Sequence, residues 1–175
     1  MPRKALTRSC STPCSTLADP TRVLRPATVD DLDDLSALCI RSKAHWGYDQ
    51  AFMAACLPEL IVTEDDIDGG RVMVAEVDGV PVAVSQVAFG SGIAELVRLF
   101  VDPDALGQGH GAALYHDALE AARAAGAPFL RIESDPFAAP FYERMGAERV
   151  GDVASETVAG RRIPLLHHRL DRHRA

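Results

Sequence analysis

Residues 99–112 read LFVDPDALGQGHGA, and this stretch decides the fold. An apolar run ending at Val101 predicts a buried strand, after which Gly107, Gly109 and Gly111 alternate up to the start of a helix. Glycine lets a backbone adopt positive φ and approach a ligand closely, and the unpaired N–H groups at a helix start attract an anion. The stretch therefore predicts a strand, a loop and a helix that together cradle a phosphate or diphosphate.

The same glycines formally satisfy the dinucleotide fingerprint, because Ala112 completes it and Glu133 lies about twenty residues further on. Two observations count against it. A segment containing Pro103 separates Val101 from Gly107, whereas a dinucleotide-binding turn follows its strand directly, and little chain remains after Glu133 for a doubly wound sheet. A P-loop is excluded because no Gly-Lys-Ser/Thr follows the glycines. A nicotinamide-dependent oxidoreductase survives only through this ambiguity.

The rest of the chain predicts a mixed α/β sheet in a single domain. Strands are expected at 23–26, 71–77, 80–89, 93–101, 129–133, 147–153 and 162–169. Asp78-Gly79 predicts a hairpin between two of them. Helices are expected from Thr28, which forms a capping box with Asp31, at 49–57 with Pro58 as the stop, at 109–125 and at 138–145. The apolar face of the long helix is expected at Leu114, Ala118, Ala121, Ala122 and Ala125.

Composition sets the class of protein. The 175 residues are 47% hydrophobic and carry a net charge of −7, which argues against disorder and against a general nucleic-acid binder. No apolar run approaches the roughly 20 residues that a membrane span needs. Basic ends flank an acidic body, which attracts cationic small molecules weakly and non-specifically. A compact enzyme with a small-molecule partner is the expected class.

Domain boundaries follow from the same composition. We expect a flexible extension at 1–22, one domain at 23–169 and a short tail at 170–175. The first 20 residues lack the apolar centre of a secretory signal, so a cytoplasmic location is expected. The four cysteines show no paired spacing that would indicate a structural zinc, and no other metal site is expected.

At this point the sequence resembles the GNAT superfamily of acetyl-CoA-dependent N-acetyltransferases. The family's signature is a strand ending in Val or Ile, four residues, and then Arg/Gln-x-x-Gly-x-Gly/Ala. Val101, Leu106, Gly109 and Gly111 occupy those positions, although Leu106 departs from the usual Arg or Gln. A polar contact near the diphosphate is therefore missing at that position.

A second family signature runs from an Asn to Gly-Phe through a Phe-Tyr pair. Residues 135–147 read DPFAAPFYERMGA and are similar to it, with Asp135 in the Asn position and Ala147 in the Phe position. The resemblance covers about 23–169 and is strongest over 93–147. It implies a GNAT-like acyl-CoA N-acyltransferase fold.

The resemblance also implies where acetyl-CoA, the cosubstrate, lies. Coenzyme A would be wedged between the strands at 93–101 and 128–134, and the backbone of Leu99, Phe100 and Val101 would pair with the pantetheine arm as an extra strand would. The other residues expected to bind the cosubstrate are Gly107, Gln108, Gly109, His110, Gly111, Ala112, Asp135 and Phe141.

The chemistry needs two proton movements, because the attacking amine must be neutral and the departing thiolate must be protonated. The resemblance implies that Tyr142 is the general acid; the alternative is an aromatic side chain on the core face of a short helix. Glu95 matches the catalytic glutamate of the histone-acetylating members, and an apolar strand would favour its proton uptake. A base acting through water, or a Glu95 that faces solvent, is the alternative.

The acceptor is less readable. His45, Trp46 and Tyr48 lie between the first two helices, which shape the acceptor pocket in the family. Trp46 either forms a wall of that pocket or plugs the core. Histidines 110, 116, 167, 168 and 173 are expected to face solvent.

The sequence predicts an enzyme that moves an acetyl group to a primary amine of a small-molecule or amino-acid-like acceptor, by direct attack in a ternary complex. The alternative is a protein of the same fold that binds acyl-CoA without transfer and acts as a sensor or partner. Loops at 41–70 and 154–163 decide the acceptor, and the sequence does not fix them. Whether the C-terminal strands pair two copies into a homodimer is also open.

Overall fold

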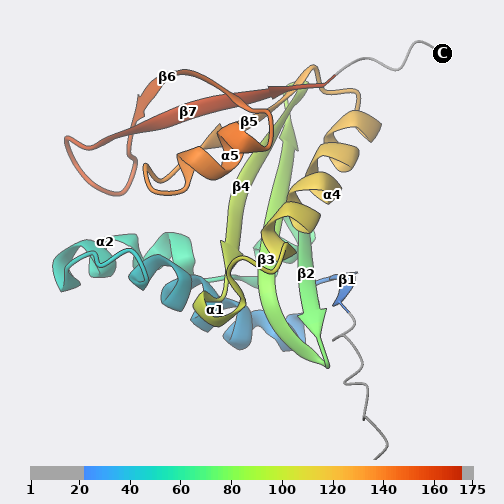
Figure 1. Cartoon of the computed structure of the whole chain (residues 1–175), viewed down its shortest axis with the longest axis vertical. Coiled ribbons are helices and arrows are strands. Elements are labelled where there is room, and N and C mark those ends of the chain that lie inside the picture. Colours follow the sequence, from blue (N-terminus) through green and yellow to red (C-terminus); the bar gives the residue numbers. More distant parts are fainter. Residues whose placement is uncertain (1–21, 171–175) are drawn as a thin grey trace, which may run out of the picture.

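The fold was obtained as a computed structural model, which describes residues 22–170. The expected extension at 1–22 and tail at 170–175 lie outside the described residues, apart from Arg22 and Leu170. The same holds for Cys10, Cys14 and His173. The described chain forms one sheet with helices on both of its faces (Figure 1).

Seven strands make up this sheet. They are β1 Arg22–Pro26, β2 Arg71–Val77, β3 Val80–Gly90, β4 Ile93–Val101, β5 Phe129–Glu133, β6 Glu148–Ala154 and β7 Arg162–Arg169. Their order is β1-β2-β3-β4-β5-β7-β6. Only β4 and β5 pair in parallel; all other neighbours are antiparallel. A doubly wound sheet needs parallel strands, so the dinucleotide-binding alternative is wrong, and the predicted mixed α/β sheet is confirmed.

Five helices and two 3-10 turns connect the described strands. The helices are α1 Leu32–Ala44, α2 Gln50–Leu60, α3 Glu64–Gly69, α4 His110–Ala124 and α5 Ala139–Arg144, and the turns are η1 Val29–Asp31 and η2 Pro103–Ala105. As predicted, Thr28 and Asp31 form a capping box. The hairpin at Asp78-Gly79 is also confirmed, since both residues have positive φ, 51° and 82°.

Alternation along β2 shows how the sheet is covered. Val72 and Val74 pack in one cluster with the buried residues of α1 and α2. Met73 and Ala75 pack on the opposite face against Leu114 of α4. A strand whose two faces are both apolar must be covered on both sides. Helices α1, α2 and α3 form the layer on one face of the sheet, and α4 forms the layer on the other face.

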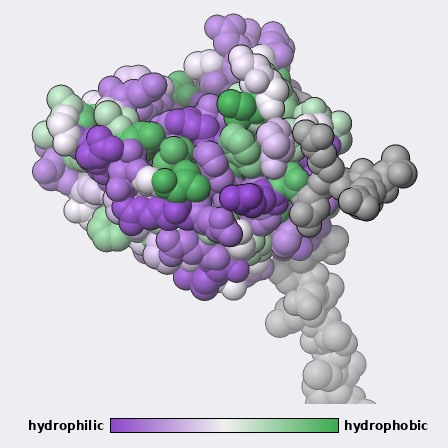
Figure 2. Space-filling model, turned by 90° about the horizontal axis from the view of Figure 1, so that it is seen from above, coloured by the Kyte–Doolittle hydropathy of each residue, from purple (hydrophilic) through white to green (hydrophobic). Residues whose placement is uncertain are grey.

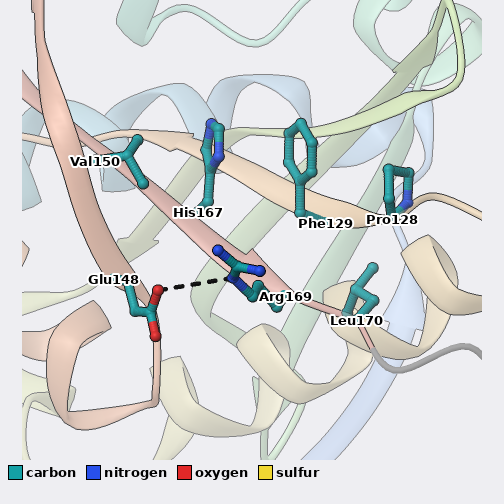
Figure 3. Close-up of a pocket in the computed structure, with 7 residues that line it drawn as sticks. All are labelled: Pro128, Phe129, Glu148, Val150, His167, Arg169 and Leu170. Carbon is teal, nitrogen blue, oxygen red and sulfur yellow. Dashed lines mark ion pairs between the residues drawn. The ribbon is translucent and has the colours of Figure 1, made fainter.

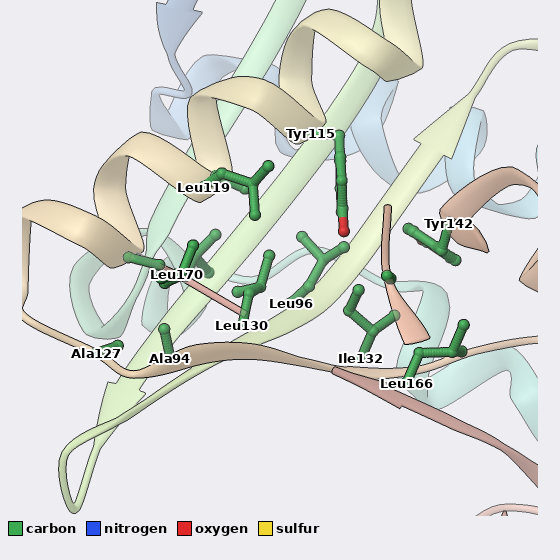
Figure 4. Packing of buried hydrophobic residues seen from close by; sticks show 14 of the residues in the cluster. Ala94, Leu96, Tyr115, Leu119, Ala127, Leu130, Ile132, Tyr142, Leu166 and Leu170 are labelled. Carbon is green, nitrogen blue, oxygen red and sulfur yellow. The ribbon is translucent and has the colours of Figure 1, made fainter. Parts of the chain in front are cut away.

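The second half of the sheet has its core on the α4 face. There Tyr115 and Leu119 of α4 pack with Leu130 and Ile132 of β5 and with Tyr142 of α5 (Figure 4). Ala121 and Ala125 were expected on this apolar face, but Ala121 is half-buried and Ala125 is exposed. The expectation for these two alanines was wrong because the face is centred on Tyr115 and Leu119 instead.

Two features of the α2–α3 region differ from expectation. Pro58 does not end α2, which continues to Leu60. The hydrogen bond lost at Pro58 would have gone to the carbonyl of Ala54, an exposed residue whose carbonyl water can satisfy. Helix α3 was not predicted, although Thr63 and Asp66 form the same kind of capping box that marks the start of α1.

The helices, cysteines and metal-ligating side chains of the described residues were compared with the expectations for a membrane span and a metal site. No helix within 22–170 is both long and apolar enough to cross a bilayer. Cys39 and Cys56 are buried free thiols, and no group of metal-ligating side chains occurs in that part of the chain. Seen from the β6–β7 side, hydrophobic side chains form small patches among hydrophilic ones (Figure 2).

Candidate active site

The site begins where β4 and β5 separate. Their parallel pairing covers only Ala94, Glu95 and Leu96 of β4. The register between β3 and β4 shifts at this point, which leaves Val97 without a partner. Such a bulge bends its strand. Residues 99–101 still pair with β3, but their other edge is not paired with any described strand.

The glycine cradle follows at the end of β4. Gly107 and Gly109 have φ of +77° and +82°, in the left-handed region that favours glycine. Gly109 is the N-cap of α4 and offers no side chain to the first turn. Among the described residues, no protein group accepts from the backbone N–H of Gly109, His110, Gly111 or Ala112. Four donors at the positive end of a helix therefore remain for an anionic ligand.

Gly111 has a different reason to be glycine. A Cβ there would lie 3.2 Å from Val101 Cγ2 and 3.7 Å from Phe141 Cζ. This glycine lets the first turn of α4 approach β4 and α5 closely. Phe141, expected at the cosubstrate site, thus lies beside the cradle and contacts Tyr115 edge-on at 6.0 Å between ring centroids.

The expectation that His110 faces solvent is wrong: it is only 5% exposed. Its Nε2 lies 3.4 Å from Oε1 of Gln108, and its Nδ1 has no partner among the described residues. Burial, reinforced by the charge of Arg22, lowers the pKa of His110, so the imidazole is neutral near pH 7. Its burial fixes the first turn of α4 in the cradle.

His168 also differs from expectation. Its Nδ1 lies 3.0 Å from the Tyr115 hydroxyl, so it belongs to a half-buried pair and not to a solvated end. His167 is half-buried and stacks on Phe129 with centroids 4.2 Å apart. His116 is exposed, as expected.

Tyr142, the expected general acid, projects from α5 toward the same space. Its ring is 6% exposed and lies 5.6 Å from that of Tyr115 (Figure 4). Within 22–170 the Tyr142 hydroxyl has no hydrogen-bond partner in the protein, and it is not among the fully enclosed polar atoms. Burial raises the pKa of Tyr142, which keeps the hydroxyl protonated at neutral pH. A protonated hydroxyl with no protein partner is available to a ligand.

Asp135 gathers three side chains from distant segments. Lys43 Nζ donates to its carboxylate at 2.7 Å, the Tyr48 hydroxyl at 2.9 Å, and Arg161 Nη2 lies 3.5 Å away. Arg161 Nη2 also donates to the Tyr48 hydroxyl at 2.8 Å. The Asp135 side chain thus binds Tyr48, a predicted acceptor residue, together with Lys43 and Arg161, while the contact with the cosubstrate that the resemblance implies stays a prediction.

We call Lys43, Tyr48, Asp135 and Arg161 the Asp135 cluster. Their contacts set the protonation states of Asp135 and Tyr48. Burial would raise the pKa of Asp135, but hydrogen bonds from Lys43 and from a backbone N–H outweigh it, so the pKa lies below its ordinary value. Burial and the adjacent carboxylate raise the pKa of Tyr48 to about 12. The cluster consequently holds an ionised carboxylate and a neutral phenol at pH 7.

Aromatic rings surround this cluster. Tyr48 stacks on Phe52 of α2 with centroids 4.0 Å apart, and the guanidinium of Arg161 lies 4.6 Å over the Phe52 ring. Trp46 stacks on Phe137 at 5.3 Å and is 38% exposed, so it is a surface wall and not a core plug. His45 contacts the edge of Trp46 at 5.6 Å. The three predicted acceptor residues therefore lie in one group near Asp135.

The surroundings of Glu95 differ from the expected apolar ones. Two-fifths of its side chain is exposed, and its carboxylate forms an ion pair with Arg131. Arg131 also pairs with Glu133 of β5. Glu95 is thus a half-exposed carboxylate on β4, held by a neighbour on β5.

Several residues around Asp135 were not predicted from the sequence. Lys43 and Arg161 bind Asp135, and Phe52 supplies the stacking surface. Glu59 of α2 is influenced by nearby charges. Burial raises the pKa of Glu59, the positive charge of Lys43 lowers it, and the negative charge of Glu133 raises it further. No local motif marks these residues, because their partners lie far away in the sequence.

A groove of about 470 Å³ lies elsewhere, at the starts of β5 and β6 and the end of β7. Phe129, His167 and Val150 line it side by side, and Arg169 pairs with Glu148 at 3.7 Å beside them (Figure 3). None of the predicted site residues lines it. The groove is therefore separate from the gap between β4 and β5.

A sheet that opens at its parallel pair, beside a glycine cradle, gives the class of protein: the acyl-CoA N-acyltransferase fold. Comparison with known proteins agrees. A family model for the acetyltransferase (GNAT) domain matches residues 40–159. That match covers more than half of the chain, which therefore belongs to the GNAT acetyltransferase family, as predicted.

Individual relatives support the same assignment. An uncharacterized N-acetyltransferase of Methanocaldococcus jannaschii is 32% identical over 144 residues, which cover 73% of this chain and 61% of the relative. The match thus spans less than two thirds of that relative's length.

Two solved structures share the fold. A GCN5-related N-acetyltransferase from Rhodopseudomonas palustris superimposes with a TM-score of 0.73 at 21% identity, over 86% of this chain and 96% of that one. The PaiA N-acetyltransferase from Thermoplasma acidophilum, solved in complex with coenzyme A, gives 0.73 at 16% identity, over 85% and 99%. The predicted GNAT fold is confirmed.

Proposed function

We propose that this chain transfers the acetyl group of acetyl-CoA to a primary amine of a small-molecule or amino-acid-like acceptor. One observation carries the proposal: the free edge of β4 leads into the donors of the cradle, and α5, which packs beside the cradle, carries the Tyr142 hydroxyl without a protein partner among the described residues. The first two fit the arm and diphosphate of a CoA thioester, and the third fits its sulfur end.

The residues present fit this cosubstrate. Four backbone N–H groups without protein acceptors suit a diphosphate, and a Cβ on Gly107 would meet open space. Beyond Val97 the β4 backbone lacks a neighbour on one edge, which suits the amides of pantetheine. The thioester so held supplies an activated acetyl carbon.

Direct transfer needs no covalent enzyme intermediate. The amine nitrogen bonds to the acetyl carbon, the carbon–sulfur bond breaks, the nitrogen loses a proton and the sulfur gains one. Tyr142 would donate the proton to sulfur, because its hydroxyl is protonated at neutral pH and has no hydrogen-bond partner among the described residues.

Glu95 would accept the proton of the amine, directly or through water. It lies on β4 beside the opening of the gap, and its ion pair with Arg131 fixes it in place. An ionised carboxylate is the form that a base requires.

The acceptor would enter from the side lined by Trp46, Tyr48 and Phe52. Lys43 and Arg161 already lie over the rings of Tyr48 and Phe52, so the exposed Trp46 is the aromatic face left for a cation. Glu95 and Glu133 share the single cation of Arg131, so one negative charge remains on that side. Both features favour a small amine that arrives as an ammonium ion.

One observation supports the alternative of binding without transfer. Leu106 replaces the polar residue of the family signature, and Asp135 is occupied by Lys43 and Tyr48. A protein of this kind would bind acetyl-CoA and release it unchanged.

Thermal unfolding with acetyl-CoA, and with NAD as a parallel control, tests the proposal first. A ligand at about a hundred times its Kd adds roughly 2.7 kcal/mol to the free energy of unfolding. For a chain of this length we expect Tm to rise by about 5–10 °C with acetyl-CoA and not with NAD. Turnover is then measured as free thiol released in the presence of small primary amines.

The outcomes separate the candidates. Stabilisation together with amine-dependent thiol release supports transfer. Stabilisation without release from any amine supports the alternative, and no stabilisation by acetyl-CoA rejects both.

A further inference from the structure

The side chain of Arg22 contacts the cradle, although the two lie 87 residues apart in the sequence. Its Nη1 donates to the carbonyl oxygen of Gly109 at 3.2 Å. The same atom lies 3.7 Å from where a Cβ on Gly109 would be. Arg22 begins β1, an edge strand, so this guanidinium stands against the first turn of α4 from outside the glycine motif.

This is an unfavourable place for an isolated cation. The start of a helix carries partial positive charge, and the first-turn N–H groups point outward without protein acceptors. The positive charge of Arg22 also acts on His110 and helps to keep that ring neutral. Positive charge therefore accumulates at the cradle, and an anion placed there would be attracted by every one of these groups.

Comparison with Arg25 on the same strand makes the point sharper. Arg25 pairs with Asp31 at 2.8 Å and with Glu76 at 2.7 Å. Arg22 forms no ion pair with any residue of the described range 22–170. The charge of Arg25 is thus balanced by two carboxylates of the protein, while Arg22 lies against the first turn of α4.

The cradle also lacks the side-chain donor that its signature would normally carry. Leu106 stands at that position, is 44% exposed and offers no hydrogen bond. With one Nη1 hydrogen bonded to Gly109, the remaining N–H groups of Arg22 are available, and a guanidinium binds phosphate oxygens in a fork.

We propose that Arg22 binds the diphosphate of coenzyme A and replaces the polar side chain missing at Leu106. This inference rests on the proposed function, since it needs acetyl-CoA or CoA as the ligand. It adds a residue from β1 to a site otherwise made by the loop and helix at 107–112.

Calorimetric titration of CoA into the wild-type chain and Arg22→Gln tests the proposal. We expect Kd to rise about tenfold, the range for a charge-assisted hydrogen bond near the surface. The dependence of Kd on salt should weaken as well, because a screened charge has been removed. The matched control is Arg169→Gln, which removes an 85% exposed arginine far from the gap and should leave Kd unchanged.

Two further ligands identify the phosphate. Dephospho-CoA lacks the 3′-phosphate but keeps the diphosphate, so Arg22→Gln should weaken it as much as CoA. Pantetheine lacks all phosphates, so the variant should bind it like the wild type. The Tm of the unliganded variant checks that its fold is intact.

Four results would overturn the proposal. An unchanged Kd for CoA would mean that Arg22 does not contact the ligand. Weakening of CoA alone would assign Arg22 to the 3′-phosphate instead. Equal weakening of pantetheine would make the effect structural. Failure of the wild type itself to bind CoA would instead reject the proposed function on which the inference stands.

Discussion

The two sides of the gap between β4 and β5 are built in different ways. On the side proposed for the cosubstrate, backbone groups of one continuous stretch, 97–112, form the free edge and the cradle. On the side proposed for the acceptor, side chains from α1, the α1–α2 loop and the β6–β7 loop meet at Asp135, which follows β5. A backbone site depends on where glycines fall, whereas a side-chain site depends on how distant segments pack.

The contrast teaches what each side can tolerate. The cradle accepts many side chains, as Leu106 shows, provided that its glycines keep their φ values. The Asp135 cluster accepts few, because three polar partners share one buried carboxylate. Substitutions on the two sides should therefore fail in different ways.

The largest effect is expected from Gly109→Val, which attacks the backbone side. A branched residue at φ +82° is strained by about 1–3 kcal/mol, which the loop relieves by changing shape. A changed loop no longer presents its N–H groups, and we expect CoA binding to fall on the order of a hundredfold.

The control for this experiment is Gly126→Val. Gly126 has φ of +72° at the other end of α4, with open space around its Cβ position. It should lose similar stability but bind CoA normally. Normal binding by a folded Gly109→Val protein would show that the cradle is not the diphosphate site.

Tyr142→Phe tests the point where the two sides meet. We expect kcat to fall by about ten- to thousandfold, at or just below the usual range for a general acid, with little change in acetyl-CoA affinity. Tyr115→Phe is the matched control, since it removes a buried hydroxyl 3.0 Å from His168 and should cost stability without lowering kcat. Equal kcat in wild type and Tyr142→Phe would remove Tyr142 from the mechanism.

Asp135→Asn attacks the side-chain side. Removing the charge leaves Lys43 and Arg161 without their buried partner, so the free energy of unfolding at pH 7 should fall by about 2–4 kcal/mol. Denaturant unfolding measures it.

The pH dependence of this loss has a definite sign. Because the folded pKa of Asp135 lies below its ordinary value, the unfolded chain takes up the proton first as pH falls. The stabilising contribution is complete above about pH 4 and is lost as pH falls through the folded pKa. The difference between wild type and Asp135→Asn should therefore be smaller at pH 3 than at pH 7. A constant difference contradicts this account, and the exposed Asp68→Asn serves as the control.

The smallest effect is expected from Leu106→Arg. The side chain is already 44% exposed, so the substitution should leave stability unchanged and improve CoA affinity by about two- to fivefold through one more screened contact. Calorimetry measures it. Loss of affinity would show that Leu106 has a role in shaping the loop that its exposure does not reveal.

The sequence predicted the backbone side well because its signals are local. Glycines at 107, 109 and 111, a strand before them and a helix after them lie within one short stretch. The Asp78-Gly79 hairpin and the Thr28 capping box are local in the same way. Each was readable because the residues that cause the structure are neighbours in the chain.

The side-chain side was only partly predictable. Tyr48 and Asp135 were both singled out, but their contact joins residues 87 apart in the sequence, and Lys43 and Arg161 carried no signal at all. The burial of His110 and His168 was missed for the same reason. Glu95 was expected in an apolar strand because the sequence does not show that Arg131 lies across from it on β5.

The sharing of Asp135 has a consequence for how new specificities could evolve. Helix α1, the α1–α2 loop and the β6–β7 loop each place one side chain on the same carboxylate, so none can be remodelled alone without leaving a charge or a hydroxyl unmatched. Paralogues with altered acceptor preference should therefore differ at residues 43, 48, 135 and 161 together or at none of them. A single carboxylate therefore ties one helix and two loops together, so that they are expected to change as one unit.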